Sequence, residues 1–415
     1  MLNIEDKQGY KYTEEFGYIP EGWEVKNIIK TSNLKARIGW QGLTTAEYLN
    51  NGDYLLITGT DFDNGKINWQ SCFYVEKKRY DQDTNIQLKN GDVLITKDGT
   101  IGKVAYIDKL PKPTTLNSGV FVVRPLNEAY NTKYFYYLLQ SNIFISFLNK
   151  LKAGSTIVHL YQKDLSNFDY IIPSDIQEQE KIAEVLGDVD SLIDKTQQLI
   201  DKKKALKTAA MQKLLTPKDN WEVVSLSKYA YVFIGLVTTM TTNYVKNGVP
   251  LIRNSDIKTN KIIRENLIQL DSKFAEEYNN RKLKIGDIVT VHTGDVGTSA
   301  IIDKTLEGAI GFATLNTRVD KNKLLPQFLC WYFNSEKFLT ECLLASTGDG
   351  RQNLNLYDFI EFNIPVPPIE EQKQISDILD AIHVEIENLE KELNKYKDLK
   401  TGMMQQLLTG KVRLI

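Results

Sequence analysis

The sequence predicts an α+β protein with two homologous domains separated by two long helices that form an antiparallel coiled coil. Three observations support this prediction. A chain of 415 residues is too long for one ordinary core. A set of motifs occurs twice in the same order, and each copy ends in a segment with heptad spacing. We therefore expect globular domains at 1–172 and 218–364 and helical segments at 173–217 and 365–415.

The repeat is clearest in two pairs of segments. LKTAAMQKLLTPK (206–218) returns as LKTGMMQQLLTGK (399–411), and LKNGDVLITKDGTIGKVAYID (88–108) returns as LKIGDIVTVHTGDVGTSAIID (283–303). Each copy has a globular segment of roughly 150 residues followed by roughly 40 helical residues, which indicates a duplicated domain and not a solenoid. The globular segments differ in detail, as expected of two copies with different targets.

The globular segments carry short strand-like runs separated by NG, GD and DG turn signals. YLLIT (54–58) and GDVLIT (91–96) are examples from the first copy. An aromatic-rich helical stretch follows in each copy, at 131–148 and 325–339. This pattern favours an α+β domain with a bent antiparallel sheet and its aromatic side chains in the core.

The helical segments show apolar residues at alternating spacings of four and three. The seam is regular in the second copy, whereas polar Thr196, Lys203 and Lys207 interrupt it in the first. A helix of about 40 residues extends roughly 60 Å. Two matched helices in one chain can cover each other's apolar stripes. The alternative is that each packs on its own globular segment or on a separate subunit.

Composition and motifs exclude several classes of protein. The net charge is -2, mean hydropathy is -0.32, and three cysteines and three histidines show no metal or disulfide spacing. No apolar run is long enough for a membrane helix, and the start lacks a signal-peptide core, so a cytoplasmic location is expected. Walker A, dinucleotide-binding and adenine-methyltransferase motifs are absent from the sequence. The chain is expected to be non-catalytic and to hold neither cofactor nor metal.

The chain resembles the specificity (S) subunit of type I restriction–modification systems over nearly all of residues 10–415. The resemblance is carried by TEEFGYIPEGWEV (13–25), the paired GDxxxxxxGxxG loops, the EQxxI helix starts and the twin LKTxxMQxLLTxK ends. It implies two target-recognition domains, at 1–172 and 218–364, that each read one half of a bipartite site in double-stranded DNA. It also implies that the conserved helical spacers, 173–217 and 365–415, set the gap.

The resemblance further implies that two methyltransferase (M) subunits dock on the helices and that motor-nuclease (R) subunits complete the complex. S-adenosylmethionine, ATP and Mg²⁺ are then expected in those partners. The twin phrase would supply two docking surfaces, with intramolecular packing as the alternative. The candidate docking residues are Leu206, Met211, Leu214, Leu215, Leu399, Met404, Leu407 and Leu408.

Candidate DNA contacts come from loop residues whose side chains suit base edges or phosphates. In the first domain they are Arg37, Gln41, Lys97, Asp98 and Lys103, and in the second they are Arg253, Asn254, His292, Arg351, Gln352 and Asn353. Two other functions remain open from the residues alone. One is an adaptor whose domains bind proteins, and the other is an enzyme with an unrecognised site in the glycine loops.

Overall fold

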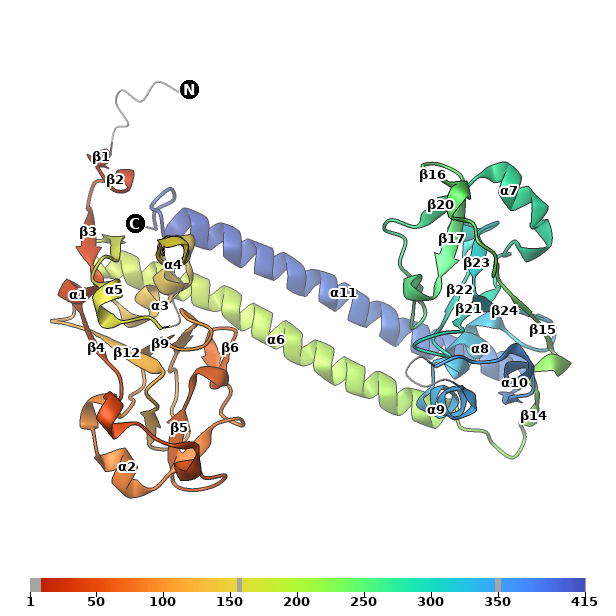
Figure 1. Cartoon of the computed structure of the whole chain (residues 1–415), viewed down its shortest axis with the longest axis horizontal. Helices are drawn as coiled ribbons and strands as arrows, with labels where there is room; N and C mark the ends of the chain where they lie inside the picture. The colour runs from red at the N-terminus through yellow and green to blue at the C-terminus, as the bar shows by residue number, and fades with distance from the viewer. Residues whose placement is uncertain (1–8, 155–158, 348–351, 415) are drawn as a thin grey trace. The chain divides into compact units, whose positions relative to one another are not determined.

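The chain forms two compact units in the computed structural model, which describes residues 9–154, 159–347 and 352–414 (Figure 1). Unit 1 comprises residues 1–196 and 392–415, and unit 2 comprises residues 197–391. Each of the two long helices, α6 (Ile176–Leu214) and α11 (Ile369–Leu407), contributes one end to each unit. The predicted α+β class, with two related domains and two long antiparallel helices, is confirmed.

Unit 1 contains a four-stranded antiparallel sheet in the order β10-β9-β12-β4 and a three-stranded sheet in the order β11-β5-β8. A β13-β3 pair joins the base of α6, and β1-β2 and β6-β7 form small ribbons. The strands are β1 (Tyr10–Thr13), β2 (Gly17–Pro20), β3 (Trp23–Asn27), β4 (Ser32–Lys35), β5 (Tyr54–Ile57), β6 (Phe62–Asp63), β7 (Lys66–Ile67), β8 (Phe73–Val75), β9 (Val93–Thr96), β10 (Val104–Tyr106), β11 (Thr114–Leu116), β12 (Val120–Pro125) and β13 (Asp169–Pro173).

Unit 2 repeats the strand order of both sheets and adds β16 at the edge of the second, giving sheets β15-β24-β21-β22 and β16-β20-β17-β23 and the pairs β14-β25 and β18-β19. The strands are β14 (Glu222–Ser225), β15 (Ala230–Ile234), β16 (Tyr244–Val245), β17 (Val249–Arg253), β18 (Ile257–Lys258), β19 (Lys261–Ile262), β20 (Ile268–Leu270), β21 (Ile288–Val291), β22 (Ser299–Ile301), β23 (Ile310–Phe312), β24 (Thr314–Val319) and β25 (Asn363–Val366).

The expectation of a bent antiparallel sheet is wrong in one respect. The second sheet of each unit is mixed, because β11 pairs parallel with β5 and β23 pairs parallel with β17. A parallel pair needs a long crossover connection. Here the β9-β10 or β21-β22 hairpin of the first sheet lies within that connection, a long-range arrangement that local periodicity does not encode.

Short helices cover the first sheet and complete a layered core in each unit. Alternation along the central strand assigns each side chain to a layer: in β9, Val93 and Ile95 join the core beneath the helices, and Leu94 joins the core between the sheets. The remaining helices are α1 (Ile28–Thr31), α2 (Lys77–Asp81), α3 (Thr132–Gln140), α4 (Asn142–Gly154) and α5 (Gln162–Leu165) in unit 1, and α7 (Ser272–Glu277), α8 (Pro326–Phe333), α9 (Glu336–Ala345) and α10 (Leu356–Ile360) in unit 2.

The two long helices pack antiparallel within each unit. In unit 1, Lys400 pairs with Asp190 at 2.7 Å. In unit 2, Lys203 pairs with Glu385 at 2.7 Å. Lys203 therefore has an ionic partner on α11, and the ammonium group of Lys207 lies 6.0 Å from the ring centroid of Trp331. Of the polar interruptions of the first seam, Lys203 is thus accommodated by an ion pair and Lys207 by a cation–π contact.

Candidate nucleic-acid interface

Four loop segments meet at one edge of the two sheets in each unit. We call this the loop edge: residues 58–61, 97–103, 117–119 and 159–160 in unit 1, and residues 253–256, 292–298, 311–313 and 352–354 in unit 2. The segments converge because β5, β9 and β11 all end there and β12 begins there. The glycine-rich loops identified in the sequence form the centre of both edges.

In unit 1 the glycine loop is fastened to the segment that follows α4. Leu160 donates its backbone N–H to the Lys97 carbonyl at 2.8 Å. The carboxylate of Asp98 lies 2.7 Å from Nδ1 of His159. Lys97 and Asp98 are half-buried, whereas Lys103 is exposed. The structure therefore brings Lys97, Asp98 and Lys103 together at one accessible edge, and their contact with DNA stays a prediction.

The same fastening occurs in unit 2 with different side chains. Leu354 donates to the His292 carbonyl at 2.9 Å, and the hydroxyl of Thr293 donates to Oδ1 of Asn353 at 3.1 Å. Burial lowers the pKa of His292, so its imidazole is neutral at pH 7 and can both donate and accept hydrogen bonds.

The other candidates of unit 2 differ in their freedom to contact a ligand. Gln352 is half-buried and accepts from the Ser346 hydroxyl at 2.6 Å. Arg253 is tied to Asp256 by two hydrogen bonds of 2.9 and 2.8 Å, so its guanidinium fork is already occupied. Arg351 lies outside the described residues.

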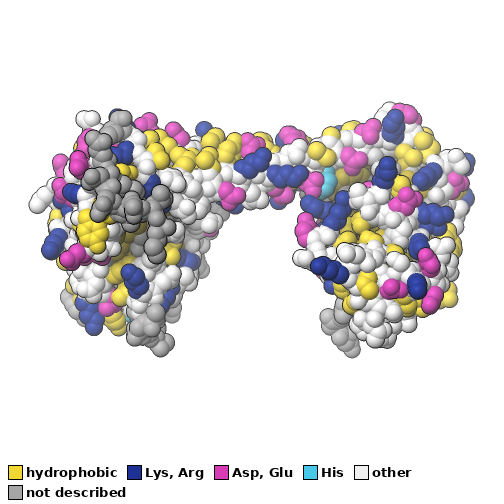
Figure 2. Space-filling model, turned by 90° about the horizontal axis from the view of Figure 1, so that it is seen from above, with side chains coloured by type: hydrophobic (Ala, Val, Ile, Leu, Met, Phe, Trp, Pro, Cys, Tyr) yellow, Lys and Arg dark blue, Asp and Glu magenta, His cyan; other side chains and the backbone are white. Residues whose placement is uncertain are grey.

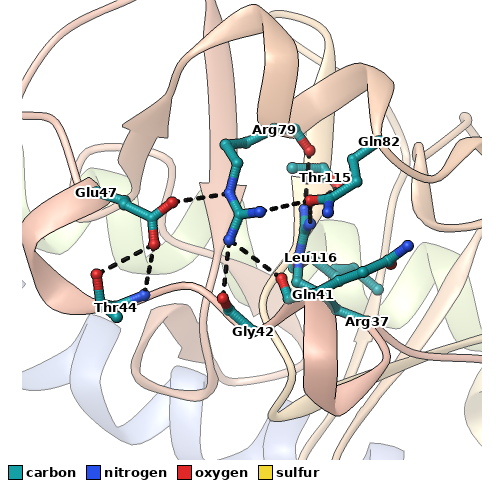
Figure 3. A network of polar contacts seen from close by, with 9 residues as sticks. All are labelled: Arg37, Gln41, Gly42, Thr44, Glu47, Arg79, Gln82, Thr115 and Leu116. Carbon is teal, nitrogen blue, oxygen red and sulfur yellow. Dashed lines mark hydrogen bonds and ion pairs between the residues drawn. The ribbon is translucent and has the colours of Figure 1, made fainter.

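Arg37 and Gln41 do not lie on the accessible surface of the loop edge. Their side chains are only 2% and 7% exposed. The guanidinium of Arg37 donates to the Leu116 carbonyl at 2.8 Å, within the network drawn in Figure 3. A base-contacting role for these two residues is not supported, because a buried side chain cannot reach a groove without rearrangement.

The network places Arg79 at its centre. Its guanidinium donates to the carbonyls of Gln41 and Gly42 at 3.2 and 2.8 Å and forms an ion pair of 2.9 Å with Glu47 (Figure 3). Glu47 in turn accepts from the Thr44 N–H at 2.9 Å. No motif or spacing in the sequence pointed to Arg79. Its contacts fix the 41–47 loop.

Sequence reasoning also missed His159 and Thr293. Both belong to pairs whose members are about 60 residues apart, so spacing alone carries no signal. The internal repeat did carry a signal that identifies them. Asn353, which was selected, aligns with His159, and Asp98, which was selected, aligns with Thr293. Transferring each candidate to the equivalent position of the other copy would have found both residues.

On the face shown in Figure 2, Lys and Arg side chains are interspersed with Asp and Glu side chains on both units. Within residues 9–154, 159–347 and 352–414, no three His, Cys, Asp or Glu side chains are grouped as metal ligands. In the same described ranges, no helix is both long and apolar enough to cross a membrane.

The twin phrase packs largely against its own chain. Leu407 and Leu408 belong to the core of unit 1, and Leu215 belongs to the core of unit 2. Their exposed fractions are 4%, 0% and 4%, so for these three the structure favours intramolecular packing over docking. Five other candidates retain accessible surface: Met211, Leu214 and Met404 are half-buried, and Leu206 and Leu399 are exposed.

A groove lies beside each copy of the phrase. In unit 2 it has a volume of about 920 Å³ and is lined by Met211 and Gln212 of α6 and by Leu339 of α9. In unit 1 it has a volume of about 450 Å³ and is lined by Met404 and Gln405 of α11, with Ile145 of α4 at the position equivalent to Leu339. The two grooves use equivalent positions of the repeat.

Comparison with known proteins gives consistent matches. The family described as "Type I restriction modification DNA specificity domain" matches residues 20–204 and 218–396. The type I restriction enzyme MjaVIII specificity subunit of Methanocaldococcus jannaschii is 27% identical, over 79% of this chain and 81% of that protein. The StySPI specificity subunit of Salmonella potsdam is 22% identical, over 96% of this chain and 90% of that protein.

Two solved structures share the fold. The crystal structure of the type I restriction–modification S subunit from M. genitalium superposes with a TM-score of 0.61 at 15% identity, over 96% of this chain and 98% of that chain. A chain from a study of complex assembly and conformational transition of the type I R-M system superposes with a TM-score of 0.56 at 17% identity, over 95% of this chain and 99% of that chain.

Proposed function

The chain belongs to the family of type I restriction–modification DNA specificity subunits, which recognise DNA and are not themselves catalysts, and from this premise we propose that its two units read the two halves of a bipartite DNA site. Unit 1 contacts one half-site and unit 2 contacts the other, each through its loop edge. The long helices, of 39 residues each, set the gap between the half-sites.

The observation that carries this proposal is the pair of loop edges. Both are built on one backbone framework, with equivalent hydrogen bonds from Leu160 and Leu354 to the glycine loop. The side chains at equivalent accessible positions differ: Asp98 and His159 in unit 1 correspond to Thr293 and Asn353 in unit 2. A shared frame with exchanged donors and acceptors is what two readers of different sequences require.

Two methyltransferase subunits are the proposed partners of the grooves beside the twin phrase. The grooves occur once per unit and offer a methionine, a glutamine and an aliphatic side chain at equivalent positions, so one partner surface could fit both. Thioether and aliphatic groups suit adaptable apolar contact. Motor-nuclease subunits would join this assembly, and S-adenosylmethionine, ATP and Mg²⁺ would be held by the partners. We propose a cytoplasmic location, where the chromosome is accessible.

The test is the adenine methylome of the source cell with and without this gene, read by long-read sequencing. Loss of one motif made of two short half-sites around a fixed gap is the expected result. A second strain carries Lys97→Ala with Lys103→Ala in unit 1, and should lose discrimination or affinity for one half-site only. An unchanged methylome in a cell that expresses the cognate methyltransferase would refute the proposal.

Partner docking is tested separately with the groove residues. Leu339→Glu should weaken binding of a methyltransferase subunit in unit 2, because a charge enters an apolar groove. The control is Asn322→Glu, which places the same charge at an exposed position outside the groove. Leu343→Glu on the same helix is unsuitable, because Leu343 also lines the groove. Stoichiometry by native mass spectrometry should fall from two partners to one. Retention of two partners would exclude the groove as the docking surface.

A further inference from the structure

The two loop edges differ in how the glycine loop is hydrogen-bonded to the turn that precedes β12 in unit 1 and β24 in unit 2. In unit 1 the Lys97 N–H donates directly to the Gly119 carbonyl at 2.8 Å, which closes the glycine loop onto the turn before β12. The equivalent residues of unit 2 are His292 and Ala313, as the repeat alignment and the register of β21 with β24 establish. The backbone N–H of His292 and the carbonyl of Ala313 are connected through a side chain.

In unit 2 the side-chain amide of Asn254 bridges the glycine loop and the turn before β24. The backbone N–H of His292 donates to Oδ1 of Asn254 at 3.1 Å, and Nδ2 of Asn254 donates to the Ala313 carbonyl at 3.2 Å. In unit 1 the two main-chain groups bond directly to each other. In unit 2 the amide of Asn254 lies between them, accepting from one and donating to the other. Asn254, a predicted base contact, is half-buried and has both functions of its amide engaged within the protein.

The position equivalent to Asn254 in unit 1 is Gly59, because both residues open the short turn after β5 or β17. A Cβ added at Gly59 would lie 3.7 Å from the Asp98 carbonyl oxygen and 3.8 Å from Cγ2 of Thr96. These are ordinary van der Waals distances, and Gly59 does not have a positive φ. Unit 1 therefore has room for a side chain at this point and lacks one.

The acceptor of the bridge has an unusual backbone. Ala313 has a φ of +49°, in the left-handed region that costs a non-glycine residue about 1 kcal/mol or more. Three hydrogen bonds hold its turn: Ala313 donates to Leu236, Leu236 donates to Gly311 at 2.7 Å, and Asn254 donates to Ala313. Such a conformation persists only where the surroundings fix it.

We propose that Asn254 is a positioning residue for sequence recognition: its amide holds the 292–298 loop of unit 2 at a spacing from the 311–313 turn that unit 1 does not share. This inference rests on the proposed function. It adds a residue that adjusts the backbone arrangement shared by the two loop edges to a different half-site. Asn254 acts through His292 and Thr293, which lie at the loop edge of unit 2, and does not itself contact a base.

The test uses Asn254→Gly, which reproduces the unit 1 residue, and the reciprocal Gly59→Asn. Each is expressed with the cognate methyltransferase in cells that lack this gene, and the methylated motif is read for both half-sites. Asn254→Gly should relax or change the half-site of unit 2 by about tenfold in discrimination, with the other half-site unchanged. Gly59→Asn should alter only the half-site of unit 1. Asn254→Asp keeps the acceptor for His292 and loses the donor to Ala313, and should give an intermediate change.

Asn322→Gly, an exposed turn residue of unit 2 away from the loop edge, is the matched control and should leave both half-sites intact. If Asn254→Gly leaves both half-sites unchanged while the motif still depends on this gene, the inference is refuted and the proposed function stands. If the gene is not required for any motif, the proposed function itself fails. If Asn254→Gly abolishes all methylation, Gly59→Asn decides: an unchanged first half-site overturns the inference, and an altered one supports it.

Discussion

Arg413 and Glu178 form the ion pair whose disruption should weaken unit 1 most clearly. The guanidinium contacts both carboxylate oxygens of Glu178, at 3.0 and 2.8 Å, and also donates to the Glu21 carbonyl at 3.1 Å. The Glu178 side chain is 0% exposed, and that of Arg413 is 29% exposed. This pair connects the end of the chain to the start of α6 and to the segment before β3.

The magnitude of the Arg413→Met effect follows from the carboxylate that it leaves behind. Removing one partner of a buried pair costs about 3–5 kcal/mol. Water can enter where the partly exposed Arg413 had been, so we expect about 2–3 kcal/mol for this variant. In the double variant with Glu178→Gln no charge is left unpaired, and the two effects should couple by about 1 kcal/mol or more.

Hydrogen–deuterium exchange with mass spectrometry measures the two units separately. The slowest amides of β3 and β13 should exchange roughly 30- to 150-fold faster in Arg413→Met, while those of β14 and β25 in unit 2 serve as the internal reference. The matched control is Lys218→Met, which removes the more exposed pair with Glu371 in unit 2 and should cost less than about 1 kcal/mol. A change below about 0.5 kcal/mol in Arg413→Met, or an equal change in both units, would refute the reasoning.

Three further predictions concern a loop, a histidine and a glycine. Arg79→Ala should speed exchange of the 42–47 amides by about tenfold, because two carbonyls and Glu47 lose their shared partner; unchanged protection there would show that the network does not hold the loop. Burial and the nearby ammonium of Lys207 lower the pKa of His383, so the folded state binds fewer protons and stability falls as the pH drops through about 6.5. His383→Gln should therefore reduce the slope of unit 2 stability against pH below 6.5, and an identical slope in chemical denaturation would contradict this. Gly102→Ala should destabilise unit 1 by about 2 kcal/mol or more, because φ is +83° and the new Cβ would lie 2.2 Å from Cδ1 of Leu148; a melting temperature equal to that of the unaltered chain would be the contrary outcome.

The docking residues illustrate where prediction from sequence succeeded and where it stopped. Heptad spacing identified both long helices, and the repeat identified the twin phrase at their ends. The phrase alone could not distinguish Leu408, which is fully buried, from Leu399, which is 49% exposed. Both are leucines on one helix, and only the surface that each meets decides the outcome. For the same reason Arg37 entered the list of DNA contacts although it is a core residue.

The sequence by itself determined the duplication, the α+β class and the two long helices, because these depend on local periodicity and on comparison of the chain with itself. It also located the glycine-rich loops, since GD and DG turns are encoded in a few adjacent residues. Tertiary structure alone decided which loops meet. Asp98 finds His159 and Asn254 bridges His292 to Ala313 only because strands that are distant in sequence end at one edge. Long-range pairing of this kind leaves no local signature, and it is this pairing that assembles the surface proposed to read DNA.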